Sequence, residues 1–374
     1  MASAKSTRGK VRYAVMGLGH IAQVAVLPAF KGARNSELVS IISGDKEKLE
    51  KVRRKFKVRE TYSYDEYEQA LADVDAVYIA LPNHLHKEYT VRAARAGVHI
   101  LCEKPMAPTE KECWEVITAA EQNGVKLMIA YRLHFEAGYL AAVRLVQDGK
   151  LGKVRFFSSE FALQVAEDNV RVRESVDQGG GPLYDLGVYC INAARYLFRE
   201  DPVEVVAMTA NNGEERFRKI EEMTSAVLRF PQERLATFTC SFGAADVSRY
   251  ALVGTKGDLL VDPAYEYAEG IRHRLTIDGK TKTKEFPKRD QFVAELVYFS
   301  DCILQDKQPE PSGLEGLADV RVVEAIHKSA QIGKMVEIPK LRPKKRPTDQ
   351  QEIHRPAHEK PKTVRTKSTS GQAA

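Results

Sequence analysis

The chain has 374 residues, of which 43% are hydrophobic and 29% are charged, a composition typical of globular proteins that excludes a fibrous or wholly disordered chain. Its length predicts two domains. The net charge of +6 resides in the two ends, with +4 in residues 1–12 and +7 in residues 339–374. Residues 13–338 therefore carry −5, which argues against a nucleic-acid-binding surface on the folded part.

Apolar runs alternate with helical patterns in the first third of the chain. The predicted strands are 11–16, 37–43, 76–81, 98–102 and 125–131. The predicted helices are an apolar stretch that reaches residue 33, then 46–56, 65–71, 87–96 and 109–123. Strands that alternate with helices of this length form a parallel sheet with right-handed crossovers, so residues 11–131 are predicted to be an α/β domain.

The pattern changes after residue 152, where one strand-like run follows another. These runs are 154–163, 203–209, 224–230, 235–242, 250–253, 258–261 and 272–277, with helices expected at 183–198, 292–305 and 317–332. Consecutive strands predict an α+β domain over residues 132–338 with a large, mostly antiparallel sheet. Residues 1–10 are predicted to be a short flexible arm, and the Lys- and Pro-rich residues 339–374 a disordered basic tail.

Cysteine usage and hydropathy indicate the compartment. The five cysteines are scattered without a Cys-x-x-Cys pair, which favours unbridged thiols in a reducing compartment over disulfides or a zinc site. No run of about 18 apolar residues occurs, and the N-terminus lacks the apolar segment of a secretory signal. The sequence therefore predicts a cytoplasmic protein that does not enter a membrane.

A glycine motif follows the first strand. Gly17, Gly19 and Ala22 have the spacing of the dinucleotide-binding turn G-x-G-x-x-[G/A]. Gly17 permits the tight turn, Gly19 lets the backbone approach a pyrophosphate, and the small Ala22 allows close packing of helix on strand. A plain strand–turn–helix is the alternative, but the position at the head of the alternating strands favours a Rossmann domain.

The end of the second predicted strand indicates which dinucleotide binds. NAD-specific sites usually place Asp or Glu there to bond the ribose hydroxyls. Here Ser43 and Gly44 end the strand, and Asp45, Lys46 and Lys48 follow. A small hydroxyl followed by cations suits the 2′-phosphate of NADP, so NADP is predicted, with NAD as the alternative. Both lysines can equally belong to the solvated face of the next helix.

Two more segments follow strands at the same carboxyl edge of the sheet, where ligands bind in such folds. His84 and His86 form a His-x-His pair, but no third ligand lies at a useful spacing, so no metal site is predicted. Glu103 and Lys104 follow the fourth strand. Burial there would lower the pKa of the lysine and ease proton transfer near neutral pH, whereas a surface loop lysine is the plain alternative.

The helix predicted at 183–198 follows a G-G-G-P run, and proline suits a first helical position. Asp185, Tyr189, Asn192 and Tyr196 share one face of this helix, so Asp185 and Tyr189 can reach one site together. A half-buried helix with a polar outer face fits the same spacing.

Several long segments, in the right order, resemble the Gfo/Idh/MocA oxidoreductases, and within that family its glucose–fructose oxidoreductase group. The segments are G-L-G-H-I-A, V-S-I-I-S-G-D, A-V-Y-I-A-L-P-N-H-L-H, C-E-K-P-M-A, K-L-M-I-A-Y-R-L-H-F, G-G-G-P-L-Y-D-L-G-V-Y-C-I-N-A-A-R-Y-L-F and L-L-V-D-P. The similarity spans about residues 10–338, and this set of motifs is more specific than any one of them.

The resemblance implies roles for individual residues. Lys104 is the implied catalytic lysine, Tyr189 the implied acid/base, and Asp185 the residue that helps position a sugar. Ser43 and Lys48 match positions that hold the 2′-phosphate of NADP, and Tyr131 and Arg132 match a pair that lines the cleft. The cofactor-binding residues predicted in this way are Gly17, Gly19, His20, Ile21, Ser43, Lys48, Leu81, Asn83, His86, Glu103, Lys104 and Arg132.

The implied activity is NADP-dependent hydride transfer to or from the CH–OH group of a sugar of the aldose or polyol type. A phenol with an ordinary pKa near 10 is a weak base at neutral pH, so the Lys104 cation is expected beside Tyr189 to lower it. One alternative is a xylose or dihydrodiol dehydrogenase of the same family. Another is a nucleotide-sensing regulator on a dehydrogenase fold, a class that tends to lose the lysine that this chain retains.

The remaining expectations concern substrate and partners. Residues 169–178 are expected to shape the sugar pocket, where Arg171 and Arg173 either contact a sugar hydroxyl or an acidic group or stay solvated. The antiparallel sheet is expected to have one open face, which a second copy covers in a homodimer or homotetramer. The basic tail is expected to be a solubilising extension, with non-specific contacts to nucleic acid or other polyanions as the alternative.

Overall fold

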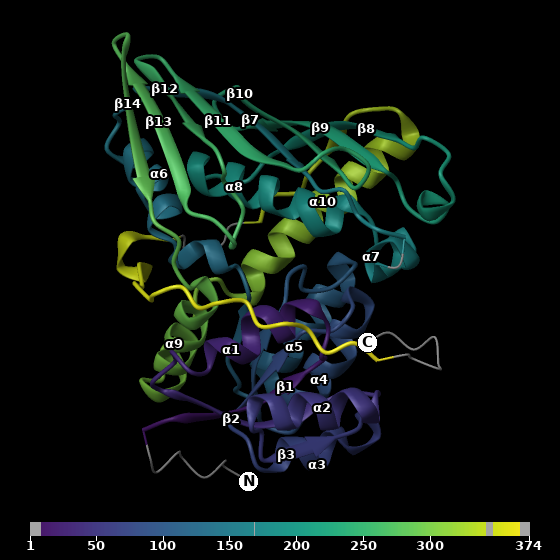
Figure 1. Cartoon of the computed structure of the whole chain (residues 1–374). Coiled ribbons are helices and arrows are strands. Elements are labelled where there is room, and N and C mark those ends of the chain that lie inside the picture. Colours follow the sequence, from purple (N-terminus) through teal and green to yellow (C-terminus); the bar gives the residue numbers. More distant parts are fainter. Residues whose placement is uncertain (1–8, 168, 342–346, 367–374) are drawn as a thin grey trace.

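The chain folds around two sheets that lie one above the other (Figure 1). The structure is a computed structural model that describes residues 9–167, 169–341 and 347–366. Helices cover both faces of the lower sheet and one face of the upper sheet (Figure 1). The predicted combination of an α/β domain with an α+β domain is confirmed.

The lower sheet is parallel and has six strands in the order β3-β2-β1-β4-β5-β6. The strands are β1 (Val11–Met16), β2 (Ser36–Ile42), β3 (Glu60–Tyr62), β4 (Ala76–Ile79), β5 (His99–Cys102) and β6 (Leu127–Ile129). Its helices are η1 (Ala22–Val26), α1 (Leu27–Ala29), α2 (Lys46–Phe56), η2 (Tyr64–Glu66), α3 (Tyr67–Ala72), η3 (Asn83–Leu85), α4 (His86–Arg95) and α5 (Glu110–Gln122). The reversal of strand order between β1 and β4 is where open α/β sheets bind ligands.

Helix α9 (Gln291–Leu304) completes this lower unit although it comes late in the chain. Phe292, Leu296 and Phe299 are buried in the same apolar cluster as Tyr13 of β1. The Tyr13 hydroxyl also lies 2.8 Å from the Ser300 hydroxyl. The sequence assigned this segment to the second domain, because an apolar helix pattern reports burial but not which sheet the helix covers.

The upper sheet has nine strands in the order β14-β13-β12-β11-β7-β10-β9-β8-β15, in which β7 and β10 pair in parallel and the other pairs are antiparallel. The strands are β7 (Val154–Ala162), β8 (Glu204–Ala210), β9 (Met223–Phe230), β10 (Arg234–Ser241), β11 (Val247–Gly254), β12 (Gly257–Val261), β13 (Ile271–Ile277), β14 (Lys280–Phe286) and β15 (Val336–Glu337). Strand β14 was not predicted, because its side chains are exposed up to Phe286 and show no alternation.

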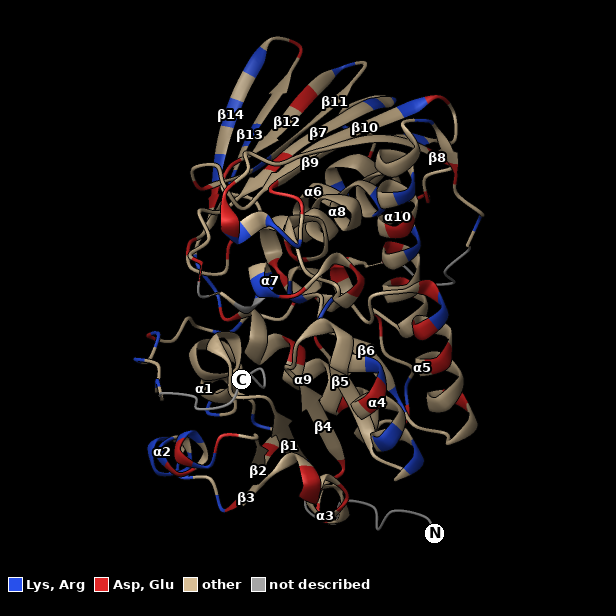
Figure 2. Cartoon of the chain, turned by 90° about the vertical axis from the view of Figure 1, so that its right-hand side faces the viewer, with Lys and Arg blue, Asp and Glu red and all other residues tan. Residues whose placement is uncertain are grey.

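The inner face of the upper sheet is covered by helices. They are η4 (Arg132–Phe135), α6 (Ala137–Gln147), α7 (Val170–Arg173), η5 (Val176–Gln178), η6 (Leu183–Gly187), α8 (Val188–Phe198), η7 (Glu215–Phe217) and α10 (Gly313–Ile332). Helix α10 packs against both β8 and α5, so it joins the two units. The outer face of the sheet carries no helix among the described residues (Figure 2).

Residues 347–366, here called the strap, run across the lower unit (Figure 1) and include η8 (Asp349–Gln351). Gln351 Nε2 donates to the carbonyl of Glu310 at 2.7 Å, and the Asp290 amide donates to the carbonyl of Arg355 at 3.0 Å. The sequence predicted disorder over 339–374, since composition reports few apolar side chains but not hydrogen bonds to a distant surface. Residues 342–346, 367–374 and most of the predicted arm lie outside the described residues.

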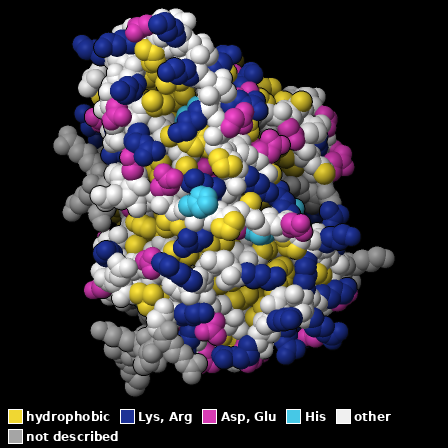
Figure 3. Space-filling view, turned by 60° about the vertical axis from the view of Figure 1, so that its left-hand side comes forward, with side chains coloured by type: hydrophobic (Ala, Val, Ile, Leu, Met, Phe, Trp, Pro, Cys, Tyr) yellow, Lys and Arg dark blue, Asp and Glu magenta, His cyan; other side chains and the backbone are white. Residues whose placement is uncertain are grey.

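Three further features bear on the predicted compartment and partners. Among the described residues, no helix is both long and apolar enough to cross a membrane. All five cysteines are buried and unbridged. On the face drawn in Figure 3, the basic side chains of the described residues are mixed with acidic and apolar ones.

Candidate active site

A cleft of about 410 Å³ lies where the carboxyl edge of the parallel sheet meets the upper unit. The turns after β1, β4 and β5 supply one wall, and the start of α8 with the segment after β12 supplies the other. Ten predicted residues line it: Gly19, His20, Ile21, Leu81, Asn83, Glu103, Lys104, Arg132, Asp185 and Tyr189. Two domains thus bring residues that are far apart in sequence to one place.

Gly17 forms the tight turn that the motif predicts. Its φ is +90°, and its amide donates to the carbonyl of Ile42 at 3.0 Å. A Cβ on this residue would come within 2.2 Å of the Ala80 carbonyl oxygen, so only glycine fits between β2 and β4. The turn leads into η1, whose start faces the cleft at Gly19 and His20, and a helix start of this kind attracts phosphates.

Asp45 follows the end of β2, and its carboxylate is already bound by neighbouring groups of the protein. Asp45 caps α2, because its Oδ1 accepts the Lys48 amide at 2.9 Å, and Lys48 Nζ lies 4.0 Å from its Oδ2. Burial opposes the charged form of Asp45, but the Thr366 hydroxyl and the Lys48 amide outweigh it and lower its pKa. Asp45 is therefore a helix cap with its carboxylate occupied, which fits the predicted lack of a ribose-binding acid.

Lys104 and Tyr189 meet at the centre of the cleft. Lys104 Nζ donates to Asp185 Oδ1 at 3.0 Å and to the Asp185 carbonyl at 2.9 Å, and both side chains are buried. The same ammonium lies 4.6 Å from the centre of the Tyr189 ring. Asp185 and Tyr189 stand one turn apart at the η6–α8 junction, so both reach the lysine of the other domain.

Asp185 is held between two cations. Arg171 Nη1 lies 2.6 Å from Asp185 Oδ2, on the side away from Lys104. Burial raises the pKa of Asp185, but Arg171 and Lys104 together outweigh burial and bring that pKa below its ordinary value. Arg171 thus pairs with an acidic group of the protein itself, while its side chain stays 44% exposed, and its predicted contact with a sugar remains a prediction.

Arg132 provides a second cation beside Tyr189. Its guanidinium lies 5.1 Å from the centre of the Tyr189 ring and is held by hydrogen bonds to the Gln291 side chain and, at 2.5 Å, to the Tyr265 carbonyl. Burial disfavours its charge, yet Tyr189 together with Glu266 and Glu295 outweighs burial, so the pKa of Arg132 is raised. The phenol of Tyr189 therefore lies in a positively charged environment.

Glu103 lies under the lysine. Its Oε1 accepts the Tyr78 hydroxyl at 2.8 Å. Burial raises the pKa of Glu103, while Lys104 opposes the shift. The carboxyl is thus fixed by the phenol of β4 and lines the cleft beside the lysine.

The two histidines of the His-x-His pair have different partners. His86 is buried, with one ring nitrogen 2.8 Å from the Pro105 carbonyl and the other 2.8 Å from the Leu81 carbonyl. Burial lowers the pKa of His86 to about 4. His84 Nδ1 faces Glu174 Oε1 at 3.3 Å. Among the described residues, no group of three or more His, Cys, Asp or Glu side chains is arranged to hold a metal ion.

Four predicted cofactor residues do not line the cleft itself. Gly17 and His86 are buried behind it and shape the turns that do. Ser43 is buried, with its hydroxyl accepting the Asp45 amide at 3.3 Å, and Lys48 is packed beside Asp45. Their predicted contacts with a 2′-phosphate remain a prediction.

The lining includes residues that sequence reasoning missed. Tyr265, Glu266, Tyr267 and Lys360 all face the cleft, together with Phe161, Leu163 and Phe292. Asn169 and Glu174 also face it, and they belong to residues 169–178, the segment expected to shape the sugar pocket. Burial raises the pKa of Glu174 to about 7, against the opposing effect of Arg171. Residues 265–267 lie in a loop and Lys360 lies in the strap, where no spacing rule in the sequence marks them, whereas Phe161 lies in β7 and Phe292 in α9.

The polar face of helix 183–198 is buried along its length. Beyond Tyr189, Asn192 Nδ2 donates to Asp319 at 2.7 Å and the Tyr196 hydroxyl donates to Glu315 at 2.9 Å. The alternative of a polar outer face is wrong. Only the first turn of this face reaches the cleft, and the rest fixes α8 against α10.

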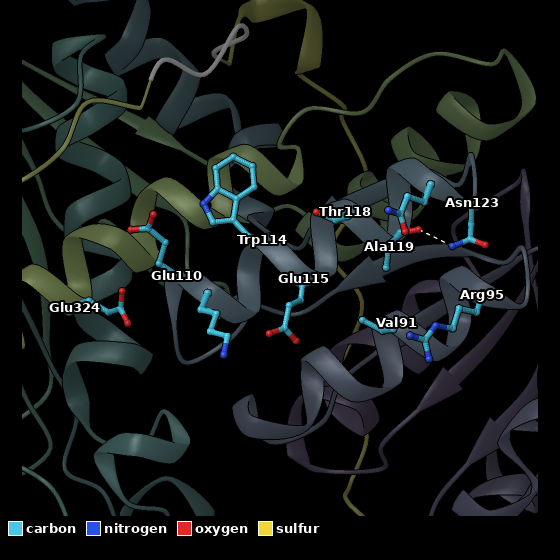
Figure 4. A pocket seen from close by; sticks show the side chains of 11 residues that line it. Val91, Arg95, Glu110, Trp114, Glu115, Thr118, Ala119, Asn123 and Glu324 are labelled. Carbon is cyan, nitrogen blue, oxygen red and sulfur yellow. Dashed lines mark hydrogen bonds between the residues drawn. The ribbon is translucent and has the colours of Figure 1, made fainter.

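A larger hollow, of about 840 Å³, lies on another surface, between α4 and α5 (Figure 4). It is lined by Trp114, Glu115 and Thr118 of α5, by Val91 and Arg95 of α4, and by neighbouring polar side chains. None of the predicted site residues lies there. Its size alone does not make it the active site.

Two family profiles match most of the folded chain. One, described as "Oxidoreductase family, NAD-binding Rossmann fold", matches residues 11–131. The other, described as "GFO/IDH/MocA C-terminal domain", matches residues 139–260.

Individual relatives match over nearly the full length. The D-xylose 1-dehydrogenase [NADP(+)] of Haloarcula marismortui is 30% identical over 340 residues, covering 89% of this chain and 94% of the relative. The solved aldose–aldose oxidoreductase of Caulobacter crescentus, complexed with glycerol, has a TM-score of 0.83 at 36% identity and covers 88% of this chain and 99% of its own. A 3-ketoreductase of Actinomadura kijaniata, solved with NADP and TDP-benzene, has a TM-score of 0.78 at 26% identity, covering 86% and 98%.

Proposed function

Because the chain belongs to the Gfo/Idh/MocA oxidoreductase family, we propose that it is an NADP-dependent enzyme that transfers hydride to or from an alcohol carbon of a sugar. The observation that carries the proposal is the contact of the Lys104 ammonium with the Tyr189 ring, in the cleft that Gly19 and His20 of the glycine turn also line. NAD is the alternative cofactor.

The residues present fit a dinucleotide. Gly17 allows the tight turn, because a Cβ there would collide with the Ala80 carbonyl oxygen, and Gly19 and His20 line the cleft where a pyrophosphate would meet a helix start. Asp45 is occupied as a helix cap, which favours the 2′-phosphate of NADP over the free ribose hydroxyls of NAD. Ser43 and Lys48 are proposed to hold that phosphate. When bound, NADP supplies the hydride acceptor for oxidation and the hydride donor for reduction.

The chain's own residues handle the proton. In oxidation the phenolate form of Tyr189 takes the proton of the substrate hydroxyl and becomes the phenol, and in reduction the phenol gives that proton back. Lys104 and Arg132 flank its ring and stabilise the negative charge that develops on the phenol and on the substrate oxygen. Asp185 holds the lysine in place through its carboxylate and its carbonyl.

A sugar is the proposed substrate class. Arg171 and Glu174 face the cleft on the side of the upper unit and offer both a donor and an acceptor for hydroxyl groups. Of the relatives named above, one is a dehydrogenase of xylose and one an oxidoreductase of aldoses. The third, the ketoreductase, was solved with a TDP compound. A dihydrodiol dehydrogenase is the alternative among enzymes. A nucleotide-sensing regulator is disfavoured because Lys104, Asp185 and Tyr189 all converge.

A substrate panel tests the function. The purified protein is incubated with NADP⁺ or NAD⁺ and with xylose, glucose, a polyol or a trans-dihydrodiol, and the absorbance of the reduced cofactor is followed. We expect turnover with NADP⁺ and at least one aldose. Turnover with the dihydrodiol alone would replace the sugar assignment, and binding of NADP without turnover on any substrate would favour a regulator.

We also propose that the outer face of the upper sheet binds a second copy of the chain. Met208 is 76% exposed, and its apolar neighbours on this face include Phe156, Val206, Val227 and Leu235. Strands β7, β9 and β10 carry few charged residues, unlike β14 (Figure 2). Light scattering after gel filtration should show a dimer or tetramer, and Met208→Glu with Leu235→Glu should yield monomers; a monomeric parent chain would contradict the proposal.

The cytoplasm is the proposed compartment. Its support is that none of the five cysteines forms a disulfide. Fractionation of cells that produce the full chain should place the protein with cytoplasmic markers, and recovery from an exported fraction would contradict this.

A further inference from the structure

The strap is fixed at its first half to the start of α9. Arg289 Nη1 donates to Glu352 at 2.9 Å, and His358 Nδ1 contacts the Asp290 carboxylate. Ile353 and Val364 pack against the apolar cluster of the lower unit. The strap therefore has defined anchors, and the path between them leads past the cleft.

The second half of the strap is tied to the residues that follow the glycine turn. The Val364 amide donates to Gln23 Oε1 at 2.6 Å, and Gln23 Nε2 donates back to the Val364 carbonyl at 3.2 Å. The same Gln23 amide group donates to the Leu18 carbonyl at 2.9 Å. One buried side chain of η1 thus braces the dinucleotide turn and holds the strap.

The strap brings cations to the cleft. Lys360 lines it, with Nζ 4.4 Å from the centre of the Tyr267 ring, and Arg132 lies 5.2 Å from the centre of that ring. Burial lowers the pKa of His20, and Lys360, Arg171 and Arg365 lower it further. Positive charge from the strap therefore gathers around the first turn of η1, where like charges repel unless an anion lies between them.

The strap ends at the other predicted cofactor contact. The Thr366 hydroxyl donates to Asp45 Oδ2, next to Ser43 at the end of β2. The Lys55 ammonium of α2 donates to the Lys362 carbonyl. The path from Lys360 to Thr366 thus runs from the substrate end of the cleft to the proposed position of the 2′-phosphate.

We propose that the strap is part of the dinucleotide site: it closes over the bound cofactor, and Lys360 and Arg365 provide cations for its phosphates. The proposal rests on the proposed function, because it needs a dinucleotide in the cleft. The cofactor carries phosphate charges that match the cations gathered there, and charge-assisted hydrogen bonds to phosphate are the strong kind. A closed strap would also slow the release of the cofactor.

The first test removes the strap from the full chain. A chain that ends at residue 346 is compared with the full chain for the Kd of NADP and for the dissociation rate of NADPH, followed by its fluorescence after mixing with excess NADP⁺. We expect truncation to raise Kd and the dissociation rate by about tenfold or more, as for the loss of two charged hydrogen bonds. Circular dichroism checks that the shortened chain is folded.

The second test needs no truncation. Lys360→Ala with Arg365→Ala is compared with Lys280→Ala with Lys282→Ala, which removes the same charge from exposed residues of β14. We expect weaker NADP binding only in the first variant. We also expect Kd to rise more steeply with salt for the full chain than for the strap variant, because screening acts on the charges that the variant lacks.

The outcomes separate the two proposals. If the full chain binds NADP but both strap changes leave Kd and the dissociation rate unchanged, the strap proposal is overturned and the proposed function stands. If truncation tightens NADP binding, the strap occupies the site instead of closing it, and the proposal is equally overturned. If the full chain binds neither dinucleotide, the proposed function fails and the strap proposal fails with it.

Discussion

Asp185→Asn removes one charge from the centre of the cleft and keeps the shape of the side chain. The carboxylate lies 3.0 Å from Lys104 Nζ and 2.6 Å from Arg171 Nη1. The Lys104 and Asp185 side chains are each 7% exposed, whereas Arg171 is 44% exposed. The substitution therefore leaves the buried ammonium beside the neutral amide oxygen and the backbone carbonyl of residue 185, without the carboxylate charge, while Arg171 can turn toward water.

The expected magnitude follows from this difference in burial. Removing one partner of a buried ion pair lowers the unfolding free energy by about 3–5 kcal/mol. We count only the pair of Asp185 with Lys104, because the pair with the exposed Arg171 contributes little. The remaining carbonyl contact places the expected loss near the lower limit, about 3 kcal/mol. The lysine loses its orientation, so kcat is expected to fall on the order of 10²-fold.

Urea unfolding and steady-state turnover with NADP⁺ measure the two effects. Asp177→Asn is the matched control, because Asp177 is exposed in the same segment and makes the same change of charge. If Asp185→Asn and Asp177→Asn agree in stability and in kcat, the carboxylate does not position Lys104 and the reasoning is wrong.

Two further predictions concern the turn and the upper wall. Gly17→Ala should lose NADP binding and about 2 kcal/mol or more of unfolding free energy, because the added methyl group meets the Ala80 carbonyl. The control is Gly213→Ala, whose φ is +86° but whose added methyl group meets open space, so it should lose stability only through backbone strain. Equal unfolding midpoints for the two variants would contradict this. The stability of Glu174→Gln relative to the parent should rise as pH increases from about 5 to 8. The Glu174 carboxyl of the folded parent has a pKa of about 7, whereas in the unfolded chain it releases its proton near pH 4.3. The unfolding free energy of the parent therefore falls as pH rises through that window, and that of the Gln variant does not. Thermal unfolding at both ends of the window measures it, and a constant difference would contradict it.

The central strands and the glycine turn could be predicted because local rules determine them. Strand 11–16 is a short apolar run that ends at a glycine that no other residue can replace. The meeting of Asp185 and Tyr189 followed from their one-turn spacing on a helix. Lys104 was placed beside them by the resemblance, since no local rule relates a lysine to a helix eighty residues later.

The missing parts depend on contacts between distant segments. Helix α9 covers the parallel sheet because Phe292 and Leu296 pack in one apolar cluster with residues of β1. The apolar pattern of the helix predicts that it is buried, but not which sheet it packs against. The strap is ordered by bonds such as those of Gln23 to Val364, and composition alone predicted disorder. Tyr267 enters the cleft on a loop whose sequence carries no periodic signal.

A double-mutant cycle of Lys104→Ala and Tyr189→Phe on the single-turnover rate of NADPH formation tests the central claim most directly. If the ammonium and the phenol act as one proton-handling unit, each single change slows the rate by about 10²-fold or more and the double change is little slower than the worse single one, with the Kd of NADP nearly unchanged. Effects that multiply, or a Lys104→Ala enzyme as fast as the parent, would contradict the account.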